Sequence, residues 1–231
     1  MVLTFFFFSF FTIAMAMVAK TARDAYFLSR FDKSILPLMF LAVAVVMGPI
    51  LTYYTKLSTK LAPRVLFMMT CTIFIGSFIL VQPLITGFVI PVVYIWVEIV
   101  VGISLIRFWT FAGDSFEPQQ AKRLFSIIAG GGSFAVMIIG MNLKPFVSVF
   151  GTDELLFLAA GFMGLAAFFG LKSMQYFKKE PAKKGTSKQT KKGAKKKKEK
   201  RDPFLVGIGT IIALSAVVTT LIDYQFKIIA S

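Results

Sequence analysis

The charged residues with the greatest chemical interest lie in otherwise apolar surroundings. The stretch KTARDAYFLSRF follows an almost unbroken apolar run and carries Lys20, Arg23 and Asp24, and Glu98 stands well inside the apolar segment IPVVYIWVEIVV. A carboxylate at the centre of a bilayer costs at least about 2.5–3.5 kcal/mol on insertion scales, and such residues usually face a bundle interior or a water-filled cavity. A role in binding or moving a charged solute is therefore predicted for Glu98, although protonation or structural pairing with a neighbouring helix would also accommodate it.

The spacing of the charges in the first segment is helical. Lys20, Arg23, Asp24 and Phe27 occupy positions i, i+3, i+4 and i+7, so they form one stripe if the first helix continues past residue 19. The alternative is an exit flank, in which long basic side chains reach for the membrane interface. Spacing alone favours neither reading.

Two further charges follow Glu98 along the same segment. Arg107 comes nine residues after Glu98, which places it on the opposite face of a helix, and Asp114 comes seven residues after Arg107 and returns to the face of Arg107. We therefore expect Arg107 and Asp114 to act as a gate or as a structural ion pair rather than to join Glu98.

Three consecutive glycines open the next apolar segment, in AKRLFSIIAGGGSF. Gly130, Gly131 and Gly132 remove side chains where another helix can approach closely, which predicts helix packing or a hinge. A phosphate-binding loop is not expected, because the GxxxxGK[ST] pattern and a preceding strand are both missing from the sequence.

The composition is that of a polytopic membrane protein. Hydrophobic residues make up 57% of the 231, and the mean hydropathy is +0.77, whereas a soluble domain is usually about 45–50% apolar. There is no His and one Cys, so no metal site, cofactor or Cys–His catalysis is expected. Nothing in the chain resembles a nucleophile–base constellation, and we predict that the protein is not an enzyme.

The apolar segments predict a fold that is all α-helical and embedded in a membrane. Spanning the hydrocarbon core takes about 20 apolar residues, and backbone in lipid must hydrogen-bond internally. We predict a six-helix bundle over residues 1–172, a Lys-rich linker over 173–203 and the start of a seventh transmembrane helix over 204–231. The six spans are expected near 2–19 (or on to about 29), 35–55, 65–82, 88–109, 124–143 and 154–171.

The distribution of basic residues predicts the orientation. With the N-terminus in the cytoplasm, 19 basic residues fall on the inside and 5 on the outside, as the positive-inside rule requires. Residues 172–201 hold 14 of the 26 basic residues, which explains the net charge of +15 without a nucleic-acid partner. We expect the linker to be disordered and to lie against anionic lipid on the cytoplasmic side.

The segment 97–133 resembles the nucleotide transporter family, the ATP:ADP antiporters of plastids and intracellular bacteria. Members carry a fourth-helix Glu, an aromatic motif, an Ala-Lys-Arg motif and a fifth helix that contains glycine; the matching positions here are Glu98, Phe108–Ala112, Ala121–Phe125 and Gly130–Gly132. KTARDAYFLSRF is similar to the family's first-helix segment, where a basic residue precedes an Asp. TTLIDYQFK, 219–227, is similar to the start of its seventh helix.

The resemblance implies the N-terminal half of a major-facilitator-like transporter that exchanges ATP and ADP in the inner membrane of a bacterium. It implies substrate-binding roles for Arg23 and Glu98, with Lys20 and Asp24 in the same stripe. A missing C-terminal half would be the partner, because alternating access needs two bundles around one site. A major-facilitator transporter of another organic anion, or a non-transporting membrane subunit or degenerate fragment, remains the alternative.

Overall fold

The computed structural model of this chain describes residues 2–82, 89–116 and 118–177, together with residues 218–220, 222 and 225. It divides the chain into two units, residues 1–180 and 181–231. All the long helices that we describe belong to the first unit. The predicted Lys-rich linker beyond residue 177 lies outside the described residues. The predicted seventh helix lies there too, except for the five helical residues 218–220, 222 and 225, and it stays a prediction.

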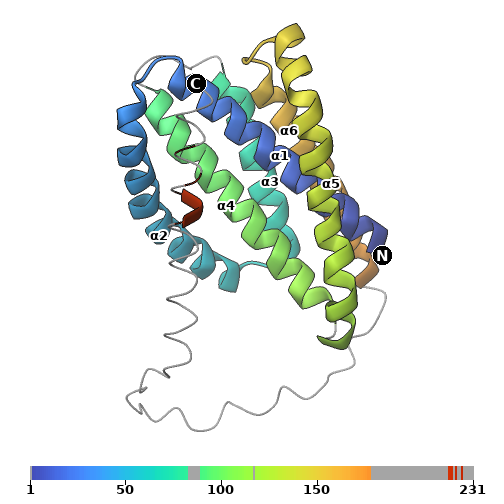
Figure 1. Cartoon of the computed structure of the whole chain (residues 1–231). Helices are drawn as coiled ribbons and strands as arrows, with labels where there is room; N and C mark the ends of the chain where they lie inside the picture. Colours follow the sequence, from blue (N-terminus) through green and yellow to red (C-terminus); the bar gives the residue numbers. More distant parts are fainter. Residues whose placement is uncertain are drawn as a thin grey trace, which may run out of the picture. The chain divides into compact units, whose positions relative to one another are not determined.

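The described part of the first unit is helical, with no strand (Figure 1). Six of its helices are long and apolar enough to cross a membrane, as expected for an integral membrane protein. In chain order the elements are α1 (Val2–Leu28), the short 3-10 helix η1 (Lys33–Ile35), α2 (Leu36–Lys60), α3 (Pro63–Val81), α4 (Ile90–Ser115), α5 (Pro118–Phe150) and α6 (Leu155–Phe177).

The helix boundaries follow from local residue chemistry. Pro63 occupies the start of α3, where the missing N–H of proline has no helical partner to lose. Helix α5 ends at Phe150, and the next residue, Gly151, adopts a φ of 83°. This left-handed conformation suits glycine, which has no Cβ to clash. The Gly151 N–H donates to the Val147 carbonyl at 2.9 Å and closes the last turn of α5.

A side-chain cap also holds the connection between α1 and α2. Asp32 precedes η1, and its carboxylate accepts a hydrogen bond from the backbone N–H of Ser34 at 2.8 Å. This bond stabilises the ionised carboxylate, so the pKa of Asp32 lies below its usual value. The hydrogen bond between Asp32 and Ser34 thus holds the turn between α1 and α2, which lies outside the apolar segments.

Helix α1 forms the centre of the six-helix unit. It packs against α4, α5 and α6, while α3 packs on α6 and α2 packs on α4 (Figure 1). In the apolar stretch of α1, 56% of the residues are buried, whereas the value for the stretch that contains α2 is 11%. Most residues in the apolar stretch of α1 are therefore covered by protein, and most of the α2 surface remains available to lipid or to a further partner.

The length of α1 resolves the open question about its charged stripe. The helix runs without interruption to Leu28, so Lys20, Arg23, Asp24 and Phe27 all belong to it. Arg23 and Phe27 are buried, with 4% and 0% of their surface exposed. Arg23 is therefore not a side chain that reaches out from an exit flank.

Two of the three consecutive glycines bring α5 against α1. A Cβ on Gly131 would lie 2.4 Å from the Phe6 carbonyl oxygen, and one on Gly132 would lie 3.0 Å from a side-chain carbon of Ile13. Nothing lies within 4 Å of a Cβ built on Gly130. The close approach of the two backbones therefore depends on Gly131 above all, since a carbonyl oxygen cannot swing away as a side chain can.

Candidate functional site

The charged residues of α1 and α4 meet in one place, which we call the charged cluster: Lys20, Arg23, Asp24 and Glu98. The two helices run antiparallel there, because Arg23 pairs with Glu98 and, one turn further along α1, Phe27 packs on Tyr94 with ring centroids 5.1 Å apart. Arg23 is five residues from the end of α1 and Glu98 eight residues from the start of α4. At 1.5 Å per residue the cluster lies about 8–12 Å inside the helix ends.

Glu98 is shared between two cations. One carboxylate oxygen, Oε1, lies 3.0 Å from the Lys20 ammonium nitrogen. The other oxygen, Oε2, accepts a hydrogen bond from Nη1 of Arg23. Because Lys20 and Arg23 are three residues apart on one face of α1, a single carboxylate from α4 can reach both. The predicted stripe and the predicted intramembrane carboxylate are thus parts of the same site.

The guanidinium of Arg23 is held on three sides. Its Nε donates to the carboxylate of Asp24 at 3.1 Å, in addition to the bond from Nη1 to Glu98. Its Cζ lies 4.1 Å from the centroid of the Tyr94 ring, close enough for a cation–π contact. A guanidinium with only 5% of its side chain exposed is thereby paired, hydrogen-bonded and stacked, which limits the cost of burying its charge.

The members of the charged cluster differ in how far their side chains are exposed. The side chain of Lys20 is 43% exposed and that of Glu98 is 25% exposed, whereas that of Arg23 is 5% exposed. An approaching solute would therefore meet the ammonium and the carboxylate before the guanidinium. The formal charges of the four members sum to zero, since two cations face two carboxylates. Guanidinium and ammonium groups are donors of the kind that can bind phosphate, and here they are paired with the carboxylates of Asp24 and Glu98.

Tyr94 is a member of the site that sequence reasoning missed. It lies four residues before Glu98, so both project from the same face of α4. Its ring is 1% exposed and is covered by Phe27 on the side of α1. The i, i+4 spacing to an intramembrane carboxylate was the available signal, but an aromatic residue at that spacing is usually no more than core packing.

The structure does not bring Arg107 into the charged cluster, nor does it join Arg107 to Asp114. Arg107 Nη2 donates to the Pro63 carbonyl at 2.9 Å, which links α4 to the start of α3. Its guanidinium carbon lies 5.9 Å from the centroid of the Tyr54 ring on α2. Asp114 is exposed, and no ion pair between these two residues occurs in the described part of the chain. A gating role for them stays a prediction.

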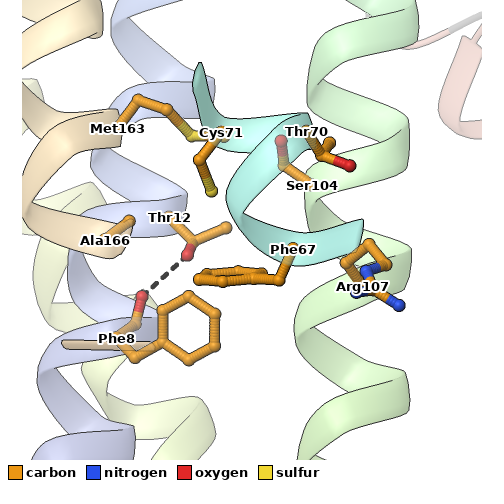
Figure 2. A pocket seen from close by; sticks show the side chains of 9 residues that line it. All are labelled: Phe8, Thr12, Phe67, Thr70, Cys71, Ser104, Arg107, Met163 and Ala166. Atoms are coloured by element: carbon orange, nitrogen blue, oxygen red, sulfur yellow. Dashed lines mark hydrogen bonds between the residues drawn. The ribbon is translucent and has the colours of Figure 1, made fainter. Parts of the chain in front are cut away.

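Arg107 lines a small pocket between α1, α3, α4 and α6, which Figure 2 shows with its nine lining side chains. Its volume is about 20 Å³, roughly enough for one water molecule and far too little for a nucleotide. The hydroxyls of Thr12, Thr70 and Ser104 donate to carbonyls in their own helices. Nε of Arg107 has no hydrogen-bond partner among the described residues. The pocket is therefore too small to hold a nucleotide.

Comparisons with protein-family models, with curated proteins and with solved structures found no match to this chain. The resemblance to nucleotide transporters therefore stays a prediction from the quoted motifs.

Proposed function

We propose that this chain is the N-terminal half of a secondary transporter that exchanges phosphorylated nucleosides across a membrane, with the charged cluster as part of its substrate site. The observation that carries the proposal is the shared pairing of Glu98 with Lys20 and Arg23 at the junction of α1 and α4. Two cations and a carboxylate that are costly to place in a membrane contact one another where α1 meets α4. Function is the usual reason for keeping such groups there.

The chemistry of the two cations suits a phosphate group. The planar guanidinium of Arg23 presents N–H donors in a fixed fork that matches phosphate oxygens, and the ammonium of Lys20 is a mobile point charge. The side chain of Arg23 is buried and that of Lys20 is partly exposed, with exposed fractions of 5% and 43%. A multiply charged solute would meet Lys20 first and the guanidinium last, which favours a polyanion over a single small carboxylate.

The proposal extends to parts of the chain that lie outside the charged cluster. The arrangement of the helices would be major-facilitator-like, with the N-terminus and the Lys-rich linker in the cytoplasm of a bacterium and the linker against anionic lipid. Segment 204–231 would begin the seventh helix of a twelve-helix protein. Because alternating access requires two bundles that rock around a central site, the second half would complete the cavity.

The experiment that tests the proposal is counter-exchange in proteoliposomes that contain the full-length gene product. Vesicles loaded with ADP should take up labelled ATP, and both Arg23→Ala and Glu98→Gln should reduce the initial rate by more than tenfold. Arg30→Ala is the matched control, because Arg30 belongs to the same stretch of sequence but is exposed beyond the end of α1. Exchange that survives both cluster substitutions would refute the assignment of the site.

A second candidate function is transport of another organic anion. The observation that favours it is the burial of Tyr94, which is 1% exposed and packs against Arg23 and Phe27. Tyr94 is therefore covered by Arg23 and Phe27 and is not placed to stack on a nucleobase. Uptake of other phosphorylated or carboxylated solutes, with no exchange of ATP or ADP, would support this candidate. Stable assembly with a partner and no transport of any solute would instead identify a membrane subunit.

A further inference from the structure

The carboxylate of Glu98 occupies the positions from which an anion would be bound. Its two oxygens take one donor each, the Lys20 ammonium at 3.0 Å and Nη1 of Arg23. A phosphate group bound between the same two cations would place its oxygens where those of Glu98 now lie. An anion that used these same N–H donors could bind only after Glu98 had released them.

We propose that Glu98 is an internal competitor, which holds the two cations while the site is empty and leaves them when an anion binds. The inference deepens the proposed function, on which it rests for the identity of the anion as a transported solute. In this role Glu98 weakens the binding of an anion, whereas a residue that attracts substrate would strengthen it. The competing carboxylate keeps the cluster neutral in the empty state, so no unpaired charge remains buried between α1 and α4.

The neighbouring carboxylate, Asp24, distinguishes competition from a general effect of negative charge. Asp24 pairs with Nε of Arg23 at 3.1 Å, on the same helix. In contrast, Glu98 comes from α4 and bridges two cations. Removing either carboxylate raises the net charge of the cluster by one. Only the removal of Glu98 frees the donors of both Lys20 and Arg23 that an incoming anion needs.

The test is equilibrium binding to the purified full-length protein in nanodiscs, with ATP and inorganic tripolyphosphate as the two probes. Glu98→Gln should tighten binding of an anionic probe by about tenfold or more, since one charge-assisted competitor is lost for each of two donors. Asp24→Asn is the comparison variant: it raises the charge of the cluster by the same unit but frees only Nε of Arg23, so its gain in affinity should be clearly smaller than that of Glu98→Gln. Unchanged or weaker binding in Glu98→Gln, or an equal gain in Asp24→Asn, would overturn the proposal.

Glu98→Asp keeps the test valid if Glu98→Gln does not fold. It retains the charge but shortens the side chain by one methylene, which draws the carboxylate back from the two cations that it now contacts. Binding should tighten by a smaller factor than in Glu98→Gln, about threefold, and the absence of any gain would contradict the inference.

The two probes separate failure of this inference from failure of the proposed function. If tripolyphosphate binding tightens in Glu98→Gln while ATP neither binds nor exchanges, the anion site with its internal competitor stands and the nucleotide assignment fails. If ATP exchanges in the wild type but neither probe gains affinity, transport stands and the competitor role is wrong.

Discussion

The pairing of Arg23 with Glu98 should contribute more to the stability of the helix bundle than the pairing of Lys20 with the same carboxylate. The two interactions share one acceptor group and differ in burial, because the side chain of Arg23 is 5% exposed and that of Lys20 is 43% exposed. The strengths of the two ion pairs can therefore be compared within one protein. Replacement by Met retains much of the length of each basic side chain and removes its charge.

The expected magnitudes follow from that difference in burial. A hydrogen bond that involves charged groups contributes about 1.5–3 kcal/mol, and the largest couplings measured between helices in a membrane protein are about 1.7 kcal/mol. We therefore expect a coupling of about 1.5–2 kcal/mol between Arg23 and Glu98. A solvent-exposed ion pair contributes less than about 1 kcal/mol, which sets the expectation for Lys20 and Glu98.

Two double-mutant cycles measure these couplings. The first combines Arg23→Met with Glu98→Gln and the second combines Lys20→Met with Glu98→Gln, each with the single variants. Unfolding by SDS in mixed micelles can be followed by the fluorescence of the two tryptophans. High salt should reduce the coupling of the exposed pair more than that of the buried one.

The relative size of the two coupling energies tests whether burial strengthens the ion pair between Arg23 and Glu98. A coupling of Arg23 to Glu98 that is no larger than that of Lys20 would show that burial does not strengthen this interaction. A coupling below about 0.5 kcal/mol for the buried pair, smaller than the average between helices in membranes, would show that Glu98 does not hold α4 against α1. Either result would remove the physical basis of the charged cluster.

Two other predictions concern the α1–α5 contact and the turn after α1. Gly131→Ala should destabilise the bundle by about 1–3 kcal/mol, because the added Cβ would lie 2.4 Å from the Phe6 carbonyl oxygen. Gly130→Ala is the control: its added Cβ meets nothing within 4 Å, so the change should be near neutral in the same SDS assay. The pKa of Asp32 is lowered by the hydrogen bond from Ser34, so the stability it contributes is present above its unfolded-state pKa and is lost as the pH falls through its folded-state pKa. The measurement is the protection factor of the Ser34 amide proton, the ratio of its intrinsic to its observed exchange rate, which should fall as Asp32 is protonated and show no such fall in Asp32→Asn. An exchange rate that follows only the intrinsic pH dependence would contradict the prediction.

Sequence patterns were sufficient for the number and type of the described long helices, because a membrane span is determined by local length and apolarity. Boundaries were less accurate where polar residues extend a helix beyond the apolar run. The predicted fifth span, 124–143, is α5, which extends from Pro118 to Phe150. The first span was predicted to end near residue 19 or near residue 29, and the structure places the end at Leu28.

The candidate site was predictable in its members but not in its connections. The i, i+3, i+4 spacing placed Lys20, Arg23 and Asp24 on one face, and the cost of an intramembrane carboxylate singled out Glu98. That Glu98 bridges Lys20 and Arg23, and that Tyr94 covers the guanidinium, depends on how α4 lies against α1. No local pattern encodes that contact, since Arg23 and Glu98 are 75 positions apart in the chain.

The sequence by itself therefore determined that this is a helical membrane protein with ionic side chains inside its apolar segments. Length, hydropathy and helical periodicity are local properties, and they are present before any helix meets another. Only the tertiary structure decided that Arg23 is buried, that Lys20 is partly exposed and that the Glu98 carboxylate pairs with both cations. Burial and ion pairing arise when separate helices exclude solvent from a shared surface, and the packing of α1 against α4 sets which charges meet.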